Sequence, residues 1–386
     1  MNSHESTKIL VVDDEPLNVK ILQIHLHARG YTVLTAGDGD EALEIVSNEI
    51  PDIILLDINM PKVDGFEVVE SVRADKKTAF IPIIMITALR DTQENRIKAL
   101  EAGADDFIEK PFNSFEVLAR IKSLLRIKFY HDTLEEHNAR LEAELQMARS
   151  VQEIIIPQNG TREIAGCHIA SYCSPTLAVG GDFFDIWEID NSCVGVLISD
   201  VMGHGASAAL VTVFIKTILT EHREHVENNP ADLLHILNVR FNDIISSRLY
   251  MFATAFCGVF DLTKQQLVCA NAGHPAPFLQ HGSQAACERI TDKHTGNGLG
   301  IHRESEYQNC YYPFDTASRV FLYTDGAYEV KNRHGEVFTI EGLEKVITRS
   351  KEDSPLQLIQ SVSNTILEFT DGSPNEDDLT LIAIQG

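Results

Sequence analysis

The first 124 residues alternate between short apolar runs and longer amphipathic stretches. The apolar runs cover residues 9–12, 32–36, 53–56, 83–86 and 106–109. The amphipathic stretches between them include residues 17–28, 41–48 and 94–102. Strands that alternate with helices in this way form a parallel sheet with helices on both faces. We therefore expect an α/β domain with a five-stranded parallel sheet.

Polar residues stand directly after four of these apolar runs. They are Asp13 and Asp14 after the first, Asp57 after the third, Thr87 after the fourth and Lys110 after the fifth. The carboxyl ends of parallel strands meet at one edge of a sheet, so these side chains are expected to converge there. Three converging carboxylates repel one another unless a cation lies between them. The pattern therefore predicts a Mg²⁺ site, since Mg²⁺ prefers oxygen ligands.

Across residues 1–124 this pattern resembles the receiver domain of two-component response regulators, which has a flavodoxin-like fold. The resemblance implies that Asp57 is the phospho-acceptor and that Asp13 and Asp14 hold the Mg²⁺ ion with it. A histidine kinase or a phosphotransfer protein would then supply the phosphoryl group. A single strand-end carboxylate could simply cap a turn, but five matching positions favour the receiver.

The same resemblance assigns roles to three further positions. Thr87 and Lys110 would contact the acyl phosphate oxygens, and Phe107 occupies the place of the aromatic switch residue. Lys110 precedes Pro111, and this peptide bond is often cis in the family.

Four acidic clusters lie beside apolar runs in the second half of the chain. They are Gly180-Gly181-Asp182-Phe183-Phe184-Asp185, Ser199-Asp200-Val201-Met202-Gly203-His204-Gly205, Tyr323-Thr324-Asp325-Gly326 and Asn375-Glu376-Asp377-Asp378. A strand-end carboxylate beside a glycine turn suits a divalent cation, because glycine lets backbone approach closely. One such turn could merely cap the next helix. Four acidic clusters in succession, three of them beside glycine turns, indicate a metal site.

These motifs, in this order, resemble the metal-dependent protein phosphatases of the PPM family. The closest branch is the SpoIIE/RsbU-like one, which dephosphorylates serine or threonine on anti-sigma factor antagonists. The resemblance covers residues 145–386 and implies an α+β sandwich of two antiparallel sheets flanked by helices. It also implies a binuclear Mn²⁺ or Mg²⁺ centre that activates water for hydrolysis. Its ligands would be Asp182, Asp200, Asp325, Asp377 and the backbone carbonyl of Val201.

Neighbouring polar residues have supporting roles in this interpretation. Asp185 and Asp378 are expected to orient ligands rather than bind metal. His204 could protonate the leaving serine oxygen, although its place in a Gly-His-Gly turn favours a structural role. His274 is interpreted as a residue that orders its loop. Helices are expected over residues 206–224, 231–247 and 356–369.

Residues 122–156 contain neither glycine nor proline and are rich in helix formers. A heptad seam with two polar interruptions runs along Leu134, Asn138, Leu141, Leu145, Ala148, Gln152 and Ile155. The seam could form a dimeric coiled coil, or the helix could pack on its own phosphatase domain. Residues 144–152 are also similar to the regulatory helix before RsbU-like phosphatase cores. We thus expect three parts: a receiver at 1–124, a helical linker at 125–157 and a phosphatase domain at 158–386.

The composition limits which binding partners and which cellular compartment we expect for this chain. The net charge of −25 argues against nucleic acid, because phosphates would be repelled. The chain has no apolar stretch of membrane-spanning length, and its first eight residues are polar. The seven cysteines form no metal-binding spacing and suit a reducing compartment. We therefore expect a cytoplasmic protein without membrane association, and a homodimer if the coiled coil forms.

Together the two halves predict a response regulator whose output is dephosphorylation of phosphoserine or phosphothreonine on a partner protein. By analogy the partner is an anti-sigma factor antagonist, and phosphorylation of Asp57 controls the reaction. The alternative is a non-enzymatic adaptor that binds a sigma or anti-sigma factor in a phosphorylation-dependent way. Degenerate domains of that kind lose metal carboxylates, whereas Asp182, Asp200, Asp325 and Asp377 are all present. A third possibility is a phosphate sink that drains a kinase through Asp57.

Overall fold

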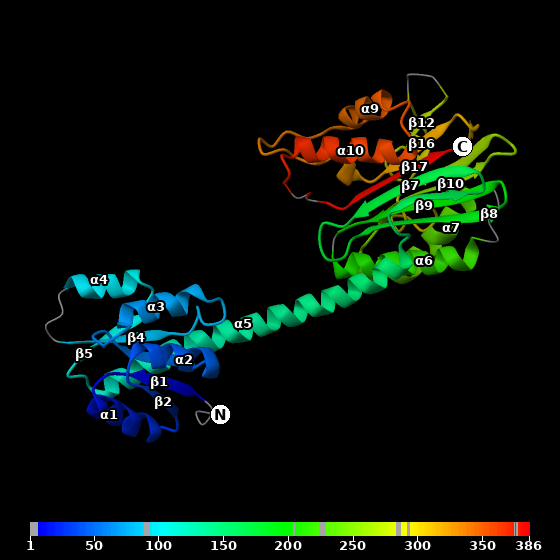
Figure 1. The fold of residues 1–386 in the computed structure, drawn as a ribbon. Helices are drawn as coiled ribbons and strands as arrows, with labels where there is room; N and C mark the ends of the chain where they lie inside the picture. The colour runs from blue at the N-terminus through cyan, green and yellow to red at the C-terminus, as the bar shows by residue number, and fades with distance from the viewer. Residues whose placement is uncertain are drawn as a thin grey trace. The chain divides into compact units, whose positions relative to one another are not determined.

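The computed structural model of the chain describes residues 7–88, 93–203, 205–223, 229–282, 287–291, 294–373, 375 and 377–386. The chain divides into two compact units, Met1–Arg140 and Leu141–Gly386 (Figure 1). Helix α5 (Ser114–Ile155) begins in the first unit and ends in the second. Among the described residues, no helix combines the length and the apolar character that a membrane span requires.

The first unit contains a five-stranded parallel sheet, as the sequence predicted, and its strand order is β2-β1-β3-β4-β5. Its strands are β1 (Lys8–Val12), β2 (Thr32–Ala36), β3 (Ile53–Asp57), β4 (Ile83–Ala88) and β5 (Asp106–Lys110). Its helices are α1 (Pro16–His27), α2 (Gly39–Glu49), α3 (Gly65–Ala74), α4 (Gln93–Glu101) and the start of α5.

The central strands of this sheet are buried on both faces. In β3, Ile54 and Leu56 belong to one apolar core, whereas Ile53 and Leu55 belong to another. Successive side chains of a strand point to opposite faces, so a continuous apolar run fills two cores. This is why β1 and β3 read as unbroken apolar runs rather than as alternating ones.

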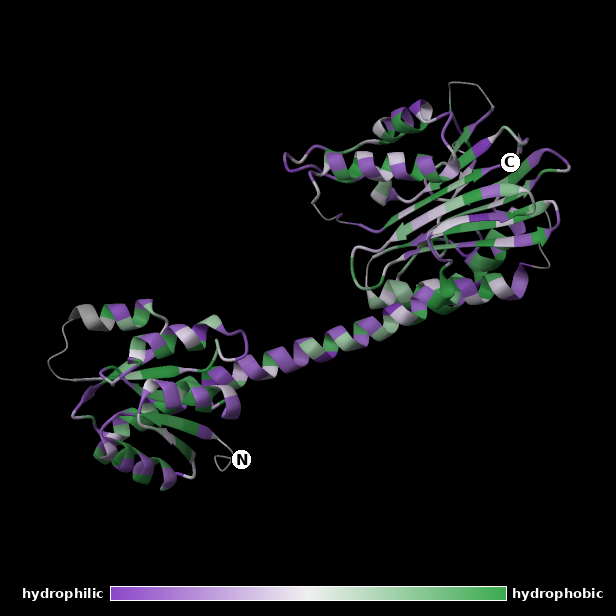
Figure 2. Cartoon of the chain, in the orientation of Figure 1, coloured by the Kyte–Doolittle hydropathy of each residue, from purple (hydrophilic) through white to green (hydrophobic). Residues whose placement is uncertain are grey.

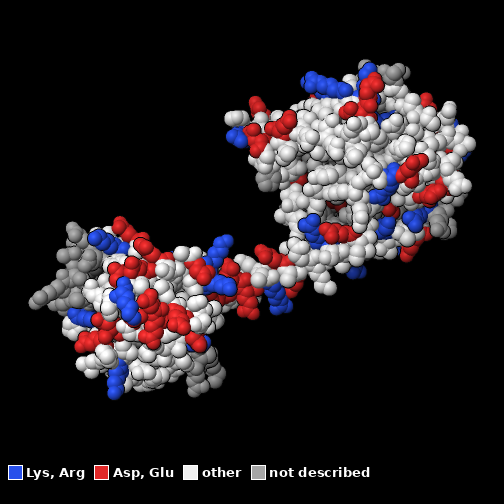
Figure 3. All heavy atoms as spheres, viewed as in Figure 1, with Lys and Arg blue, Asp and Glu red and all other residues white. Residues whose placement is uncertain are grey.

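Helix α5 is 42 residues long, or about 63 Å at 1.5 Å per residue. Its first turns pack in the receiver core through Val117, Leu118 and Ile121. Farther along, Leu134 and Leu141 are more than half exposed. Both acidic and basic side chains lie along this exposed length (Figure 3). The predicted linker, residues 125–157, is therefore helical as far as Ile155.

The second unit is a sandwich of two sheets. One has the order β14-β11-β10-β9-β8, with β15 also pairing with β11, and the other has the order β13-β12-β16-β17-β7-β6. The first sheet contains β8 (Asp182–Asp190), β9 (Cys193–Val201), β10 (Ala253–Asp261), β11 (Gln266–Ala272), β14 (Thr295–Gly296) and β15 (Cys310–Pro313). The second contains β6 (Gly160–Ile164), β7 (Cys167–Ser174), β12 (Phe278–Gln280), β13 (Glu288–Arg289), β16 (Arg319–Tyr323) and β17 (Leu379–Gln385).

Helices cover both outer faces of this sandwich. Helices α6 (Ala206–His222) and α7 (Pro230–Phe241) pack on the first sheet, and α9 (Ile340–Arg349) and α10 (Pro355–Phe369) pack on the second. Between the sheets lies a core to which Phe184, Phe256 and Ile382 belong. In Figure 2 the strands of the sandwich carry many residues in the apolar colour. After α7 the chain continues as a π-helix, η2 (Asn242–Ser246), and a short helix, α8 (Ser247–Leu249).

Candidate functional site

The receiver acids are Asp13, Asp14 and Asp57, at the carboxyl ends of β1 and β3. Each contributes a carboxylate oxygen to a group in which all the oxygens lie within 4.8 Å of one another. Lys110 Nζ lies 2.8 Å from Asp13 Oδ2 and 2.7 Å from Asp57 Oδ1. Burial raises the pKa of Asp57, although Lys110 opposes this shift. The three oxygen donors fit a Mg²⁺ ion. Together with Lys110, the ion would neutralise the negative charge of the three carboxylates.

The residues predicted to contact the phosphoryl group lie beside these acids. Thr87 on β4 is one position beyond Ile86, which pairs with Asp57 in the sheet. The Thr87 hydroxyl is buried and has no hydrogen-bond partner among the described residues. A buried hydroxyl without a partner suits an incoming phosphoryl oxygen. Phe107 is half-buried on β5, and the Lys110–Pro111 peptide bond is cis.

The sandwich acids are Asp182, Asp200, Asp325 and Asp377. Asp182 and Asp200 pair directly across β8 and β9. Asp182 is buried, and its Oδ2 accepts hydrogen bonds from Thr324 Oγ1 at 2.8 Å and Thr380 Oγ1 at 2.7 Å. These threonines lie at the ends of β16 and β17, so one carboxylate joins the two sheets.

Burial and neighbouring acids raise the pKa of Asp182, Asp200 and Asp325. Burial and the charges of Asp325 and Asp377 raise the pKa of Asp200 to about 7. Burial and the charge of Asp377 raise the pKa of Asp325 to about 6. The pKa of Asp182 lies well above its usual range because of burial and the charge of Asp200. Divalent cations would relieve this repulsion, and these hard oxygen donors fit Mn²⁺ or Mg²⁺.

Two glycines allow backbone to approach these acids. A Cβ atom on Gly181 would lie 2.7 Å from the carbonyl oxygen of Val201, the predicted backbone ligand. A Cβ atom on Gly326 would overlap the carbonyl oxygen of Asp378. The Gly-Gly-Asp and Asp-Gly motifs are therefore required by close packing around the sandwich acids.

Asp378, which the sequence predicted to orient a ligand, is hydrogen-bonded to the backbone before Asp182. Its Oδ1 accepts a hydrogen bond from the N–H of Thr176 at 2.8 Å, and its Oδ2 accepts one from the N–H of Gly181 at 2.6 Å. The carboxylate thereby fixes the turn before Asp182. Asp377 is exposed and accepts a hydrogen bond from the N–H of Asp378.

Asp185 does not join the sandwich acids, contrary to the expectation that it orients a ligand. Its Oδ2 lies 2.6 Å from Lys216 Nζ on α6. Asp182 and Asp185 are three residues apart on one strand, so their side chains point to opposite faces. His204, the candidate proton donor, lies outside the described residues.

The sequence interpretation missed the role of Gln152, which it treated as a polar interruption of a seam. Gln152 is only 6% exposed. Its Nε2 donates to the carbonyl of Gly180 at 2.8 Å and to Thr212 Oγ1 at 3.2 Å. Its Oε1 accepts from the N–H of Gly180 at 3.2 Å. The last turns of α5 therefore hold the residue two positions before Asp182.

His274 is an ordering residue, in agreement with the sequence interpretation. Its backbone N–H donates to Asn271 Oδ1 at 2.8 Å, and its Nδ1 lies 2.8 Å from Thr254 Oγ1. Burial lowers the pKa of His274 to about 3, so its ring is neutral.

Comparisons with known proteins agree with this division of the chain. Residues 9–122 match the family "Response regulator receiver domain", and residues 190–385 match the family "Stage II sporulation protein E (SpoIIE)". Response regulator PleD of Caulobacter vibrioides is 46% identical over 134 residues, which are 35% of this chain and 29% of PleD. The regulatory protein PhoP for alkaline phosphatase synthesis, from Bacillus subtilis, is 49% identical over 119 residues, 31% of this chain and 48% of PhoP. The chain thus spans less than half the length of these curated relatives.

A solved structure supports the fold of the second unit. The SiaA-PP2C domain of Pseudomonas aeruginosa superposes with a TM-score of 0.56 at 20% identity, covering 65% of this chain and 98% of that domain. The SpoIIE match extends over more than half of the chain. The chain therefore carries a response-regulator receiver domain followed by a PPM-type phosphatase domain, and it belongs to the SpoIIE family.

Proposed function

We propose that this chain hydrolyses phosphoserine or phosphothreonine on a partner protein and that phosphorylation of Asp57 controls the reaction. The observation that carries the proposal is the position of Asp182, Asp200 and Asp325 at strand ends of a SpoIIE-family domain, where burial and neighbouring acids raise the pKa of all three. The substrate we propose is a phosphorylated anti-sigma factor antagonist, by analogy with the family.

The residues of the chain prepare the sandwich site for cations. Asp182, Asp200, Asp325, Asp377 and the carbonyl of Val201 would hold two Mn²⁺ or Mg²⁺ ions. Those ions, when bound, supply an activated water molecule and neutralise charge on the phosphoryl oxygens.

The supporting hydrogen bonds keep this arrangement in place without the substrate. Thr324 and Thr380 fix the Asp182 carboxylate, and Asp378 fixes the turn before it. Ligands that are already oriented spare the reaction the cost of reorganisation.

The receiver residues support transfer of a phosphoryl group to Asp57 from a histidine kinase or a phosphotransfer protein. Asp13, Asp14 and Asp57 would hold Mg²⁺, which shields the negative charge of the incoming group. Lys110 already contacts Asp57, and the Thr87 hydroxyl, which has no partner within the described part of the chain, could donate to a phosphoryl oxygen.

Helix α5 is the element through which we propose that the two sites are coupled. It begins in the receiver core and ends at Gln152, which is hydrogen-bonded to Gly180. Ile155, one turn later, packs against the core beneath α6. The exposed residues Leu134 and Leu141 on the same helix support the proposal of a homodimeric coiled coil.

The test is hydrolysis of p-nitrophenyl phosphate and of a phosphoserine peptide by the purified chain with saturating Mn²⁺. We expect activity that a chelator removes and Mn²⁺ restores. A folded chain that binds Mn²⁺ but hydrolyses neither compound would contradict the proposal and favour the adaptor. Capture on an Asp325→Asn variant, followed by mass spectrometry, would then test whether the bound phosphoprotein is an antagonist that the unmodified chain dephosphorylates.

A further inference from the structure

A group of large apolar side chains is exposed close to the sandwich acids. We call it the apolar rim: Met202, Leu249, Tyr250, Phe252 and Ile301, which are 37–87% exposed. Met202 follows Asp200 by two positions, and its N–H donates to the carbonyl of Phe252 at 3.0 Å. The rim is therefore continuous with the strand ends that carry the predicted metal ligands.

The rim borders a groove of about 770 Å³. One wall is the π-helix η2 with the segment that follows it, including Ser246 and Tyr250, and the other is the segment from Gly300 to Arg303. π-Helical turns occur frequently at functional sites. Here the polar residues Asn242, Asp243 and Ser246 of the turn line the groove, and Tyr250, which is 87% exposed, lines it as well.

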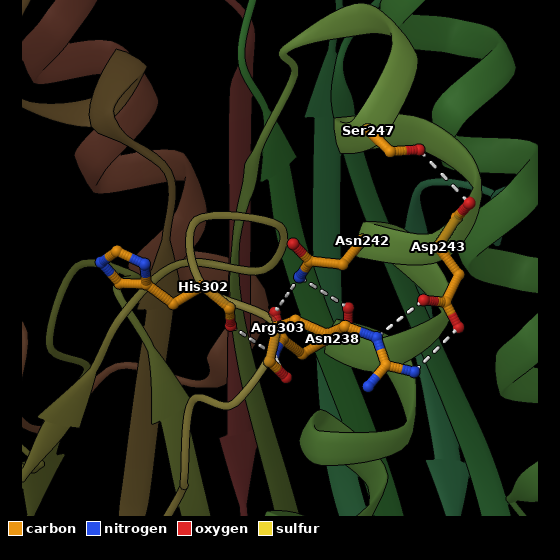
Figure 4. A network of polar contacts seen from close by, with 6 residues as sticks. All are labelled: Asn238, Asn242, Asp243, Ser247, His302 and Arg303. Carbon is orange, nitrogen blue, oxygen red and sulfur yellow. Dashed lines mark hydrogen bonds and ion pairs between the residues drawn. The ribbon is translucent and has the colours of Figure 1, made fainter.

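A buried asparagine fixes the second wall of the groove. Asn238 on α7 is fully buried, and its Nδ2 donates to the carbonyls of His302 at 2.9 Å and Arg303 at 3.1 Å (Figure 4). Its Oδ1 accepts from the N–H of Gly300 at 2.9 Å. Arg303 Nε also lies 2.8 Å from Asp243 Oδ1 on the first wall. The two walls are thus joined by hydrogen bonds and an ion pair.

The walls also approach each other closely. Gly300 has a φ of +90°, and a Cβ atom there would overlap Ser246 Oγ. Ser246 Oγ in turn donates to the carbonyl of Met251 at 2.8 Å. The rim therefore stands on a fixed frame, although its apolar side chains face solvent.

We propose that the apolar rim and its groove dock the phosphoprotein substrate through apolar residues that flank its phosphoserine. Exposed apolar groups that lie together mark interaction surfaces, and aromatic and methionine side chains are enriched at the centres of such interfaces. A frame that is already ordered loses less conformational entropy when a partner binds. The proposal rests on the proposed function. It identifies apolar contact with the rim as the means by which the sandwich site selects phosphoproteins over small phosphate esters.

The test compares two synthetic phosphoserine peptides of equal length on the full chain with saturating Mn²⁺. One peptide carries leucine and phenylalanine around the phosphoserine, and the other carries serine and glycine at the same places. We expect kcat/KM to be about tenfold higher for the apolar peptide, equivalent to about 1.4 kcal/mol. The double variant Tyr250→Asn, Ile301→Ser should reduce this ratio to near one and leave hydrolysis of p-nitrophenyl phosphate unchanged.

Asparagine suits position 250 because Tyr250 has a left-handed φ of +54°, which asparagine tolerates. Leu367→Ser on α10, 57% exposed, is the matched control and should retain the tenfold preference. The proposal is overturned if the unmodified chain shows no preference for the apolar peptide. It is overturned too if the double variant loses as much p-nitrophenyl phosphate hydrolysis as it loses kcat/KM for the apolar peptide. It is also overturned if the double variant keeps the preference for the apolar peptide. A change in sedimentation mass would then make the rim an interface between copies of the chain. Absence of all hydrolysis by the unmodified chain would instead contradict the proposed function.

Discussion

The receiver acids and the sandwich acids are both carboxylates at strand ends, but they balance their negative charge differently. In the receiver, Lys110 lies within hydrogen-bonding distance of both Asp13 and Asp57. In the sandwich, Asp200 and Asp325 face other acids, and their pKa values rise to about 7 and about 6. We infer that the receiver site balances part of its charge with a cationic side chain, whereas the sandwich site depends more strongly on cations from solution. Loss of metal should therefore affect the sandwich far more than the receiver.

The largest effect is expected from Asp200→Asn or Asp325→Asn. Each change removes a charged ligand from a site that stabilises the phosphoryl oxygens by several kcal/mol, so hydrolysis should fall by about a thousandfold or more. Hydrolysis of p-nitrophenyl phosphate measures the loss, and circular dichroism confirms that the variants fold. Activity near that of the unmodified chain, at saturating Mn²⁺, would refute the assignment of these ligands.

The coupling between the two sites should be the next largest effect. Phosphorylation of Asp57 is expected to change the hydrolysis rate by about 5- to 150-fold, in a direction that we leave open, because allosteric coupling is typically worth about 1–3 kcal/mol. Two residues inserted after Asn138 would rotate the following part of α5 by roughly 200°. The insertion should remove the regulation and preserve both the labelling of Asp57 and the basal hydrolysis. Regulation that survives the insertion would exclude α5 as the transmitter.

Gln152→Ala should have a smaller effect, a decrease of about tenfold in basal hydrolysis. The change removes the hydrogen bonds to Gly180, and a buried backbone group left without a partner costs about 1–3 kcal/mol. Steady-state kinetics with Mn²⁺ titration would show the loss as weaker metal binding, since the turn before Asp182 is no longer held. Gln146→Ala, an exposed position on the same helix, is the control. Equal behaviour of the two variants would show that Gln152 has no positioning role.

The smallest effect is a pH dependence of stability. The folded chain without metal raises the pKa of Asp200 from 3.8 to about 7, so the folded state binds more protons than the unfolded state between these values. Stability should therefore fall as the pH rises from about 4 to about 7, and Mn²⁺ should remove this dependence. Each kcal/mol lost corresponds to a shift of about 2–4 °C in Tm for a domain of this size. Calorimetry of the metal-free chain and of the metal-free Asp200→Asn variant measures Tm as a function of pH. If Tm depends on pH equally in both, Asp200 is not the cause of the dependence.

Patterns local to the sequence predicted most of the receiver. All five strands were expected within two residues of their bounds, because each is an apolar run and four of the five runs are followed by a polar residue. The helix expected over residues 231–247 is instead interrupted by the π-helix η2. Just before this π-helix, Asn238 is hydrogen-bonded to a loop 62–65 positions farther along the chain, a contact that no local pattern reports.

The misplacement of Asp185 could have been avoided from the sequence alone. Asp182 and Asp185 stand at odd spacing on one strand, and a strict period of two assigns them to opposite faces. Gln152 is different, because a heptad pattern does not distinguish a seam facing a second helix from one that packs within the same unit. The contact with Gly180 shows that the second applies at this end of α5.

The most direct test of the account measures hydrolysis of a phosphoserine peptide by the full chain with Mn²⁺, in the presence and absence of beryllofluoride and Mg²⁺. We predict Mn²⁺-dependent hydrolysis whose rate beryllofluoride changes by about 5- to 150-fold in the unmodified chain and leaves unchanged in Asp57→Ala. The same response in Asp57→Ala, or no hydrolysis under any condition, would contradict a phosphatase controlled from Asp57.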